Sequence, residues 1–140
     1  MTEVKFFFNV PHKLNFACRL AKKAFEEGRQ LIVYAPHNAD EFDRSLWTFA
    51  QLSFIPHVRA GSALAAETPI VIAVDDSALT HHEALLNLDD TPPPFFSRFE
   101  HLREIVSTEE EDKAMARERL KFYKARGFAI QHQDMKGTSE

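Results

Sequence analysis

Hydrophobic residues along the chain form short continuous runs, separated by stretches in which they recur every three or four positions. The short runs are typical of buried strands and occupy residues 4–10, 30–35, 69–74 and 83–88. Residues 103–107 predict a further strand. Residues 54–58 predict a short strand whose proline is typical of a sheet edge.

Helical spacing predicts three helices between these strands. Apolar residues over positions 14–25 share one face, and Gly28 follows as a helix stop. Asn38 precedes a second amphipathic segment and is a residue type favoured at helix starts. A long last helix is predicted over residues 108–127, with acidic residues in its first turn.

The alternation of strands and helices predicts an α/β fold. The chain opens with a β-α-β unit, which joins parallel strands. We therefore expect a single-domain three-layer sandwich with a mainly parallel sheet, because 140 residues suit one domain. Residues 1–130 are assigned to this domain, and residues 131–140 to a C-terminal tail that is flexible at its end.

Composition restricts the location and the partners of the chain. The net charge of −4 argues against a general nucleic-acid binder, which needs a positive field to displace counterions. The single cysteine, Cys18, cannot form an internal disulfide, which fits a reducing cytoplasm. The sequence has no uninterrupted apolar run of about 18 residues and no signal-peptide pattern. We expect a cytoplasmic protein with no membrane contact.

The motifs of common catalytic and nucleotide-binding sites are absent from the sequence. The first strand-to-helix turn, "NVPHKLNF", has no glycine, which excludes the dinucleotide fingerprint and the phosphate loop as motifs. Cys18 lies on the apolar face of its helix, as a packing thiol does. The sequence therefore predicts a nucleotide-binding-like topology without a nucleotide site, with no catalytic residue and no cofactor.

The segment "VDDSALTHH" contains the one group of residues that resembles a metal site. Asp75, Asp76, His81 and His82 are suitable ligands at the end of a predicted strand. Adjacent histidines on a strand would face opposite ways, however, and no third fixed ligand is evident. A solvated loop is the simpler interpretation. A small α/β enzyme with its active site near Asp75–His82 remains an alternative.

The predicted last helix carries a basic stripe, which we define as Lys113, Arg117, Lys121 and Lys124. Only Glu110 is placed to neutralise it, since Glu118 lies outside the stripe. A solvated charged face is one interpretation, and direct nucleic-acid binding is another. Because the stripe borders Leu120, a short acidic and partly hydrophobic peptide suits it better than a polynucleotide.

Trp47 lies outside the apolar face of the second helix, about 140° around the helix from Phe42. It shares this flank with Asp43 and Ala50, and Phe54 follows shortly after the helix. Trp47 either covers the edge of the core or anchors an interface, a role in which exposed tryptophan is enriched.

Several segments together resemble the chi subunit family of bacterial DNA polymerase III. They are "LW" at residues 46–47, "SFIPH" at residues 53–57, "PIVIAV", and "ARERLKFYKARGF", which is the most specific. The resemblance implies a non-catalytic accessory of the clamp-loader complex that acts in DNA replication. It also implies two protein partners. One is the psi subunit or an equivalent, and the other is the acidic C-terminal tail of single-stranded DNA-binding protein, which ends in aspartates, proline and phenylalanine.

Matching the family's motifs to this sequence assigns residues to two surfaces. The tail-binding residues that the resemblance implies are Val106, Lys113, Arg117, Leu120 and Lys121, and Lys124 is added as the last member of the basic stripe. The psi-binding residues are Trp47 and Phe54. The resemblance implies no metal and little direct DNA binding.

Overall fold

A computed structural model describes residues 1–49 and 54–136. Within these residues, seven strands form one sheet with the order β3-β4-β2-β5-β6-β1-β7, and every neighbouring pair is parallel. The strands are β1 (Glu3–Val10), β2 (Leu31–Tyr34), β3 (His57–Arg59), β4 (Ile70–Ala73), β5 (Ala84–Asn87), β6 (His101–Ser107) and β7 (Ile130–Asp134).

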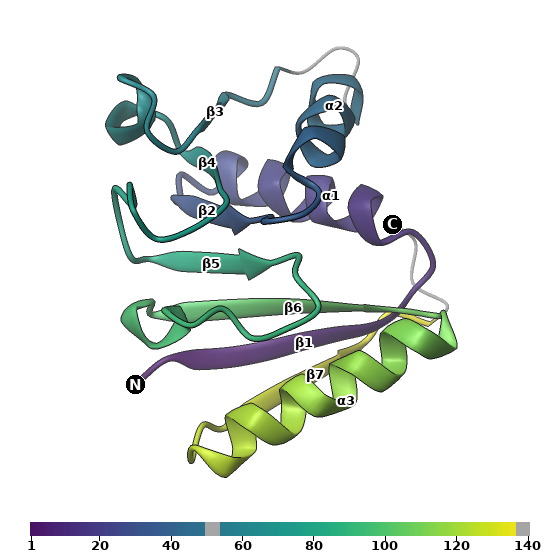
Figure 1. The fold of residues 1–140 in the computed structure, drawn as a ribbon. Coiled ribbons are helices and arrows are strands. Elements are labelled where there is room, and N and C mark those ends of the chain that lie inside the picture. The colour runs from purple at the N-terminus through teal and green to yellow at the C-terminus, as the bar shows by residue number, and fades with distance from the viewer. Residues whose placement is uncertain (50–53, 137–140) are drawn as a thin grey trace.

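Helices cover both faces of the sheet (Figure 1). Helices α1 (Lys13–Glu26) and α2 (Ala39–Phe49) pack on one face, whereas α3 (Glu110–Ala125) packs on the other. Figure 1 shows α3 lying along β1 and β7, far from α2. The structure thus confirms the predicted α/β fold with three layers and a parallel sheet.

Each sheet face carries its own hydrophobic core, because alternate strand residues point to opposite faces. On the α1 face, Phe16 and Phe42 pack in one cluster with Phe7. On the α3 face, Phe6 and Tyr123 belong to the second cluster. Neighbouring residues of β1 therefore serve different cores.

Cys18 is completely buried in the core of the α1 face. Burial raises the pKa of its thiol to about 12, because the charged thiolate is disfavoured away from water. The thiol is therefore protonated at neutral pH and packs as a small apolar group.

The structure refines two details of the expected elements. The strand expected over 54–58 is β3, three residues at the sheet edge. The carbonyl of Asn38 accepts the Phe42 N–H at 3.0 Å, but the Asn38 side-chain oxygen is buried with no hydrogen-bond partner among the described residues. Ser53 and Ala50, which the sequence analysis also named, lie outside the described residues.

β7 was not predicted from the sequence. Its residues, Ile130–Asp134, read IQHQD and are mostly exposed, so they lack the apolar run that marks a buried strand. They nevertheless pair with β1 along their whole length. Met135, the next residue, is buried in the core of the α1 face.

A buried polar cluster joins α3 to the centre of the sheet. The Glu104 carboxylate on β6 accepts a hydrogen bond from Arg119 Nε at 3.0 Å and another from the Tyr123 hydroxyl at 2.6 Å. Asn87 of β5 donates to the same carboxylate at 2.9 Å. Arg119 also donates to the Asp90 carbonyl at 3.0 Å. The cluster fixes which side of α3 faces the sheet.

The charges in this cluster are almost fully removed from water. The side chains of Arg119 and Glu104 are 1% and 0% exposed. Burial raises the pKa of Glu104, and the adjacent Arg119 guanidinium opposes that shift. Burial and the Glu104 carboxylate also raise the pKa of Tyr123, which keeps its hydroxyl proton as a donor.

We predict that Arg119→Met lowers the free energy of unfolding by about 3–5 kcal/mol, because it leaves the Glu104 charge buried without its partner. Adding Glu104→Gln should recover part of the loss, since a neutral amide removes that uncompensated charge. Urea unfolding measures both variants, with exposed Lys124→Met as a control on the same helix. An Arg119→Met variant within about 1 kcal/mol of the parent would contradict a structural role for the pair.

Candidate functional site

The start of α3 is held by an aspartate in its first turn. Asp112 accepts the backbone N–H of Ser107 at 2.7 Å and the ammonium of Lys13 on α1 at 3.1 Å. Desolvation acts to raise the pKa of Asp112, but these hydrogen bonds and the Lys13 charge outweigh it and lower the pKa. The carboxylate thus ties α3 to the end of β6 and to α1.

A pocket lies between α3 and the edge of the sheet, with a volume of about 230 Å³. Its wall combines apolar and cationic side chains from three strands and one helix. The lining residues are Phe6, Phe8, Val106, Lys113, Ala116, Arg117, Leu120 and His132. We call this cavity the α3 pocket.

The α3 pocket unites four of the residues implied for tail binding, namely Val106, Lys113, Arg117 and Leu120. Val106 is buried beneath the helix, and Leu120 is half-buried. Arg117 is exposed and has no ion pair or hydrogen bond within the described part of the chain. Its guanidinium is therefore available to a ligand.

The two remaining members of the predicted site do not line the pocket. Lys121 and Lys124 are exposed further along α3. Lys121 pairs with Glu118 at 3.4 Å, and Lys113 pairs with Glu110 at 3.4 Å. The expectation that only Glu110 could neutralise the basic stripe was therefore wrong, because a side chain outside the stripe can reach it at i,i+3 spacing.

Sequence reasoning found Val106 on β6 but missed the rest of the sheet side of the pocket. Phe6 and Phe8 lie on the α3 face of β1, alternating with residues on the α1 face, and His132 comes from β7. The His132 ring lies 6.5 Å from the Phe6 ring and 6.3 Å from the Phe8 ring, between ring centroids. The alternation within the apolar run of β1 could have indicated Phe6 and Phe8, but His132 depends on a strand with no hydrophobic signal.

A bulge in β1 adjoins this wall. Asn9 has a left-handed φ of 62°, and the pairing of β1 with β6 shifts between Phe7 and Val10. Asn9 donates from Nδ2 to Asp134 of β7 at 2.8 Å. Since asparagine tolerates this conformation better than most residues, the bulge and the Asp134 contact together close the end of the β1–β7 pair.

Trp47 and Phe54 form a separate exposed surface, which we call the Trp47 surface. Their side chains are 59% and 61% exposed, and their ring centroids are 5.3 Å apart. The ring of buried His57 lies 4.9 Å from Trp47 in an edge-on arrangement. A single exposed hydrophobic side chain is common, but two exposed aromatic rings in contact form a patch of the kind that interfaces use, so the surface suits a protein partner.

Polar and charged side chains hold the base of the Trp47 surface. His57 contacts Asp43 through Nε2 at 2.9 Å and the Ile55 carbonyl through Nδ1 at 2.7 Å. Arg59 donates to Asp43 at 3.0 Å and to Asp40 at 2.8 Å. These contacts fix α2 against the edge strand β3, so that Trp47 and Phe54 are presented together.

The segment with Asp75 and His82 forms no compact ligand set. Asp75 accepts from Ser77, Asp76 pairs with Arg98 at 3.1 Å, and the His82 ring packs on Phe99. No group of three or more potential metal ligands was found within residues 1–49 and 54–136. A search of these residues for membrane-spanning segments also found no helix with the required length and apolar character.

The fold and its surfaces define a class of protein: a small α/β domain with a cation-lined apolar pocket on one helix and an aromatic surface on another. The chain belongs to the family described as DNA polymerase III chi subunit, HolC, whose model matches residues 1–131.

Three relatives carry the name DNA polymerase III subunit chi. The protein from Pseudomonas aeruginosa is 33% identical over 121 residues, which cover 85% of this chain and 84% of the relative. The Haemophilus influenzae protein is 29% identical, with 81% of each chain covered. The Escherichia coli protein is 26% identical over 81% of this chain and 79% of the relative.

We predict a pH-dependent contribution from Asp112. Its lowered pKa means that its stabilisation is present above the ordinary value of 3.8 and is lost as the pH falls through the folded-state pKa. Asp112→Asn should therefore cost about 1–2 kcal/mol at pH 7 and progressively less below pH 3.8. Urea unfolding from pH 7 to pH 2.5 measures the difference, with Glu111→Gln as a neighbouring control. A difference that stays constant with pH would contradict this role.

Proposed function

We propose that this chi-family protein is a non-catalytic accessory subunit that links the clamp-loader complex of DNA polymerase III to single-stranded DNA-binding protein during replication. The link is made through the acidic C-terminal tail of that protein. The observation that carries the proposal is the α3 pocket, in which Arg117 and Lys113 stand beside an apolar cavity.

The chemistry of the pocket matches a tail that ends in aspartates, proline and phenylalanine. The terminal phenylalanine ring enters the apolar cavity against Val106 and Leu120, where burial from water favours it. Arg117 receives the terminal carboxylate, because its planar fork can donate two parallel hydrogen bonds. Lys113, with Lys121 and Lys124 beyond it, faces the aspartates as point charges.

An acidic peptide fits the α3 pocket better than nucleic acid does. Two of the four stripe residues, Lys113 and Lys121, already have carboxylate neighbours, so the helix offers a weak field to a polyanion. The cavity of about 230 Å³ accommodates one side chain rather than a strand of bases. We therefore assign little direct DNA binding to the basic stripe.

The Trp47 surface serves the second partner, the psi subunit or an equivalent. It lies on α2 and the loop before β3, whereas the α3 pocket lies on the other face of the sheet. One subunit can therefore hold both partners at once. This arrangement is what a tether between the polymerase complex and protein-coated DNA requires. The protein acts in the cytoplasm and uses no cofactor.

We predict that Arg117→Ala weakens binding of a tail peptide by about tenfold to hundredfold, the range for losing a charge-assisted hydrogen bond. The parent affinity should be about micromolar, since a flexible tail is ordered on binding. Calorimetry with a peptide ending in aspartates, proline and phenylalanine measures both values. Lys22→Ala, on α1 at the opposite face, is the control.

The same titration has a second arm in which the peptide lacks its final phenylalanine. That peptide should bind at least tenfold more weakly, because the apolar cavity is then empty. If Arg117→Ala binds like the parent, or if the shortened peptide binds like the full one, the α3 pocket is not the tail site.

We predict that Trp47→Ala or Phe54→Ala weakens binding to the psi subunit of the same organism by about thirtyfold, as truncation of an interface anchor does. Tail-peptide affinity should be unchanged in both variants. Calorimetry compares them with Phe25→Ala, which removes another partly exposed aromatic outside this surface. Equal psi affinity in parent and Trp47→Ala would show that this surface serves another purpose.

A further inference from the structure

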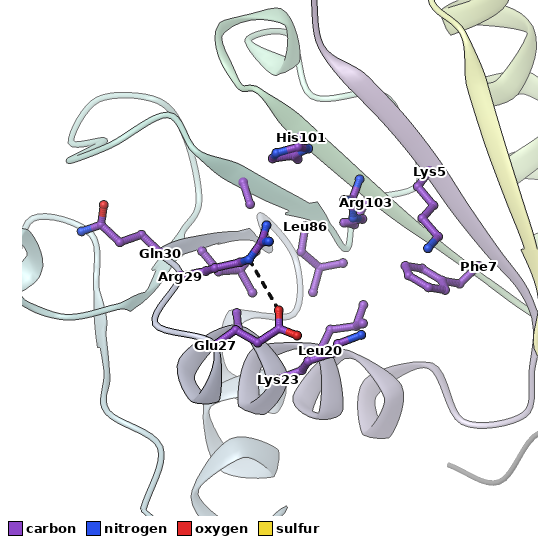
Figure 2. A pocket seen from close by; sticks show the side chains of 13 residues that line it. Lys5, Phe7, Leu20, Lys23, Glu27, Arg29, Gln30, Leu86, His101 and Arg103 are labelled. Carbon is purple, nitrogen blue, oxygen red and sulfur yellow. Dashed lines mark ion pairs between the residues drawn. The ribbon is translucent and has the colours of Figure 1, made fainter.

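The α1 face of the sheet carries a second basic cavity, unrelated to either surface described above. It lies between α1 and the strands β1, β5 and β6, with a volume of about 160 Å³. Figure 2 shows Lys5 and Arg103 near each other on neighbouring strands, with Lys23 on α1 across the cavity. We call it the Lys5 cleft.

Lys5 and Arg103 are direct register partners in the parallel β1–β6 pair. Both therefore project from the same face, at the spacing of adjacent strands, which is about 4.8 Å. Like charges placed opposite each other on a sheet destabilise it. Both side chains line the Lys5 cleft, so the repulsion between Lys5 and Arg103 is located at this cavity.

Neighbouring acids neutralise only part of the charge. Glu3 pairs with Arg103 at 3.3 Å, and Glu27 pairs with Arg29 at 3.5 Å. Neither Lys5 nor Lys23 has a carboxylate within ion-pair distance among residues 1–49 and 54–136. The cleft therefore retains a local positive charge in a protein whose net charge is −4.

Lys5 is held in place rather than free in solvent. It is half-buried, and its ammonium lies 4.9 Å from the centroid of the buried Phe7 ring. Desolvation lowers the pKa of Lys5, and the charges of Arg103 and Lys23 lower it further. An anion between these three groups would offset their mutual repulsion and favour the charged form of Lys5.

We propose that the Lys5 cleft binds a phosphate group through Lys5, Lys23 and Arg103. A phosphate carries close to two negative charges and presents three acceptor oxygens, which suits three cations from three elements. A carboxylate offers only two oxygens. The guanidinium of Arg103 is also matched to phosphate geometry. The proposal is independent of the tail-binding function.

A larger cavity continues from the cleft along α1. It has a volume of about 560 Å³ and shares Lys5, Phe7, Leu20 and Lys23 with the cleft. Lys22 also lines it. The adjoining space can hold the remainder of a phosphate-bearing ligand, whether a small molecule or a strand of nucleic acid.

The test is a calorimetric titration of the full chain with pyrophosphate. Lys5→Gln and Arg103→Gln should each weaken binding about tenfold, because each removes a charged donor. Lys136→Gln, an exposed lysine beyond β7, should bind like the parent. Lys5→Gln should also have a melting temperature at or above that of the parent, since it removes the repulsion from Arg103. A loss of binding then reflects the site rather than unfolding.

Two further ligands identify the source of the phosphate. An oligothymidylate that competes with pyrophosphate, and loses affinity in Lys5→Gln, indicates a nucleic-acid backbone. An oligothymidylate that does not compete indicates a free phosphate compound. Pyrophosphate binding that is equal in parent, Lys5→Gln and Arg103→Gln would overturn the proposal. The proposal would also be overturned if a polyglutamate peptide bound in the cleft and pyrophosphate did not.

Discussion

The buried contact between Glu104 and Arg119 is the constraint on which the arrangement of α3 depends. A helix turns by about 100° per residue, so fixing one inward side chain fixes the direction of all the others. With Arg119 held at 3.0 Å from the carboxylate, Leu120 borders the pocket and Arg117 is left at its rim. A well-packed apolar pair can give the same stability as a buried charged pair. The charged pair differs because it is satisfied only when Arg119 faces Glu104, which permits a single rotation of the helix about its axis.

The α3 pocket also depends on the parallel sheet, because its wall comes from distant parts of the chain. Phe8 lies near the N-terminus, Val106 in the last third of the chain and His132 near the end of the described residues. β1 brings them together, since it pairs with β6 on one side and β7 on the other. A long apolar strand at the centre of this half of the sheet thus provides the floor of a surface site.

Sequence patterns predicted the features that depend on local order. The apolar runs indicated the buried strands, and helical spacing placed Lys113 and Arg117 on one side of α3. The helical spacing also placed Trp47 outside the apolar face of its helix, which indicated an exposed side chain. Local sequence patterns could not predict the burial of Arg119. A charged side chain is rarely buried without a partner, and the partner here, Glu104, lies on a different element. β7 was missed because an edge strand needs no apolar run, and the wall residue His132 was missed with it.

The most direct test of the account is the position of the terminal phenylalanine of a bound tail peptide. Intermolecular nuclear Overhauser effects on the full chain can locate that ring, using an isotope-labelled protein and an unlabelled peptide. The account predicts contacts from the ring to the methyl groups of Val106 and Leu120. It also predicts that the backbone amide resonance of Arg117 changes its chemical shift on binding. Contacts from the ring to Trp47 or Phe54, with no change at Leu120, would contradict it.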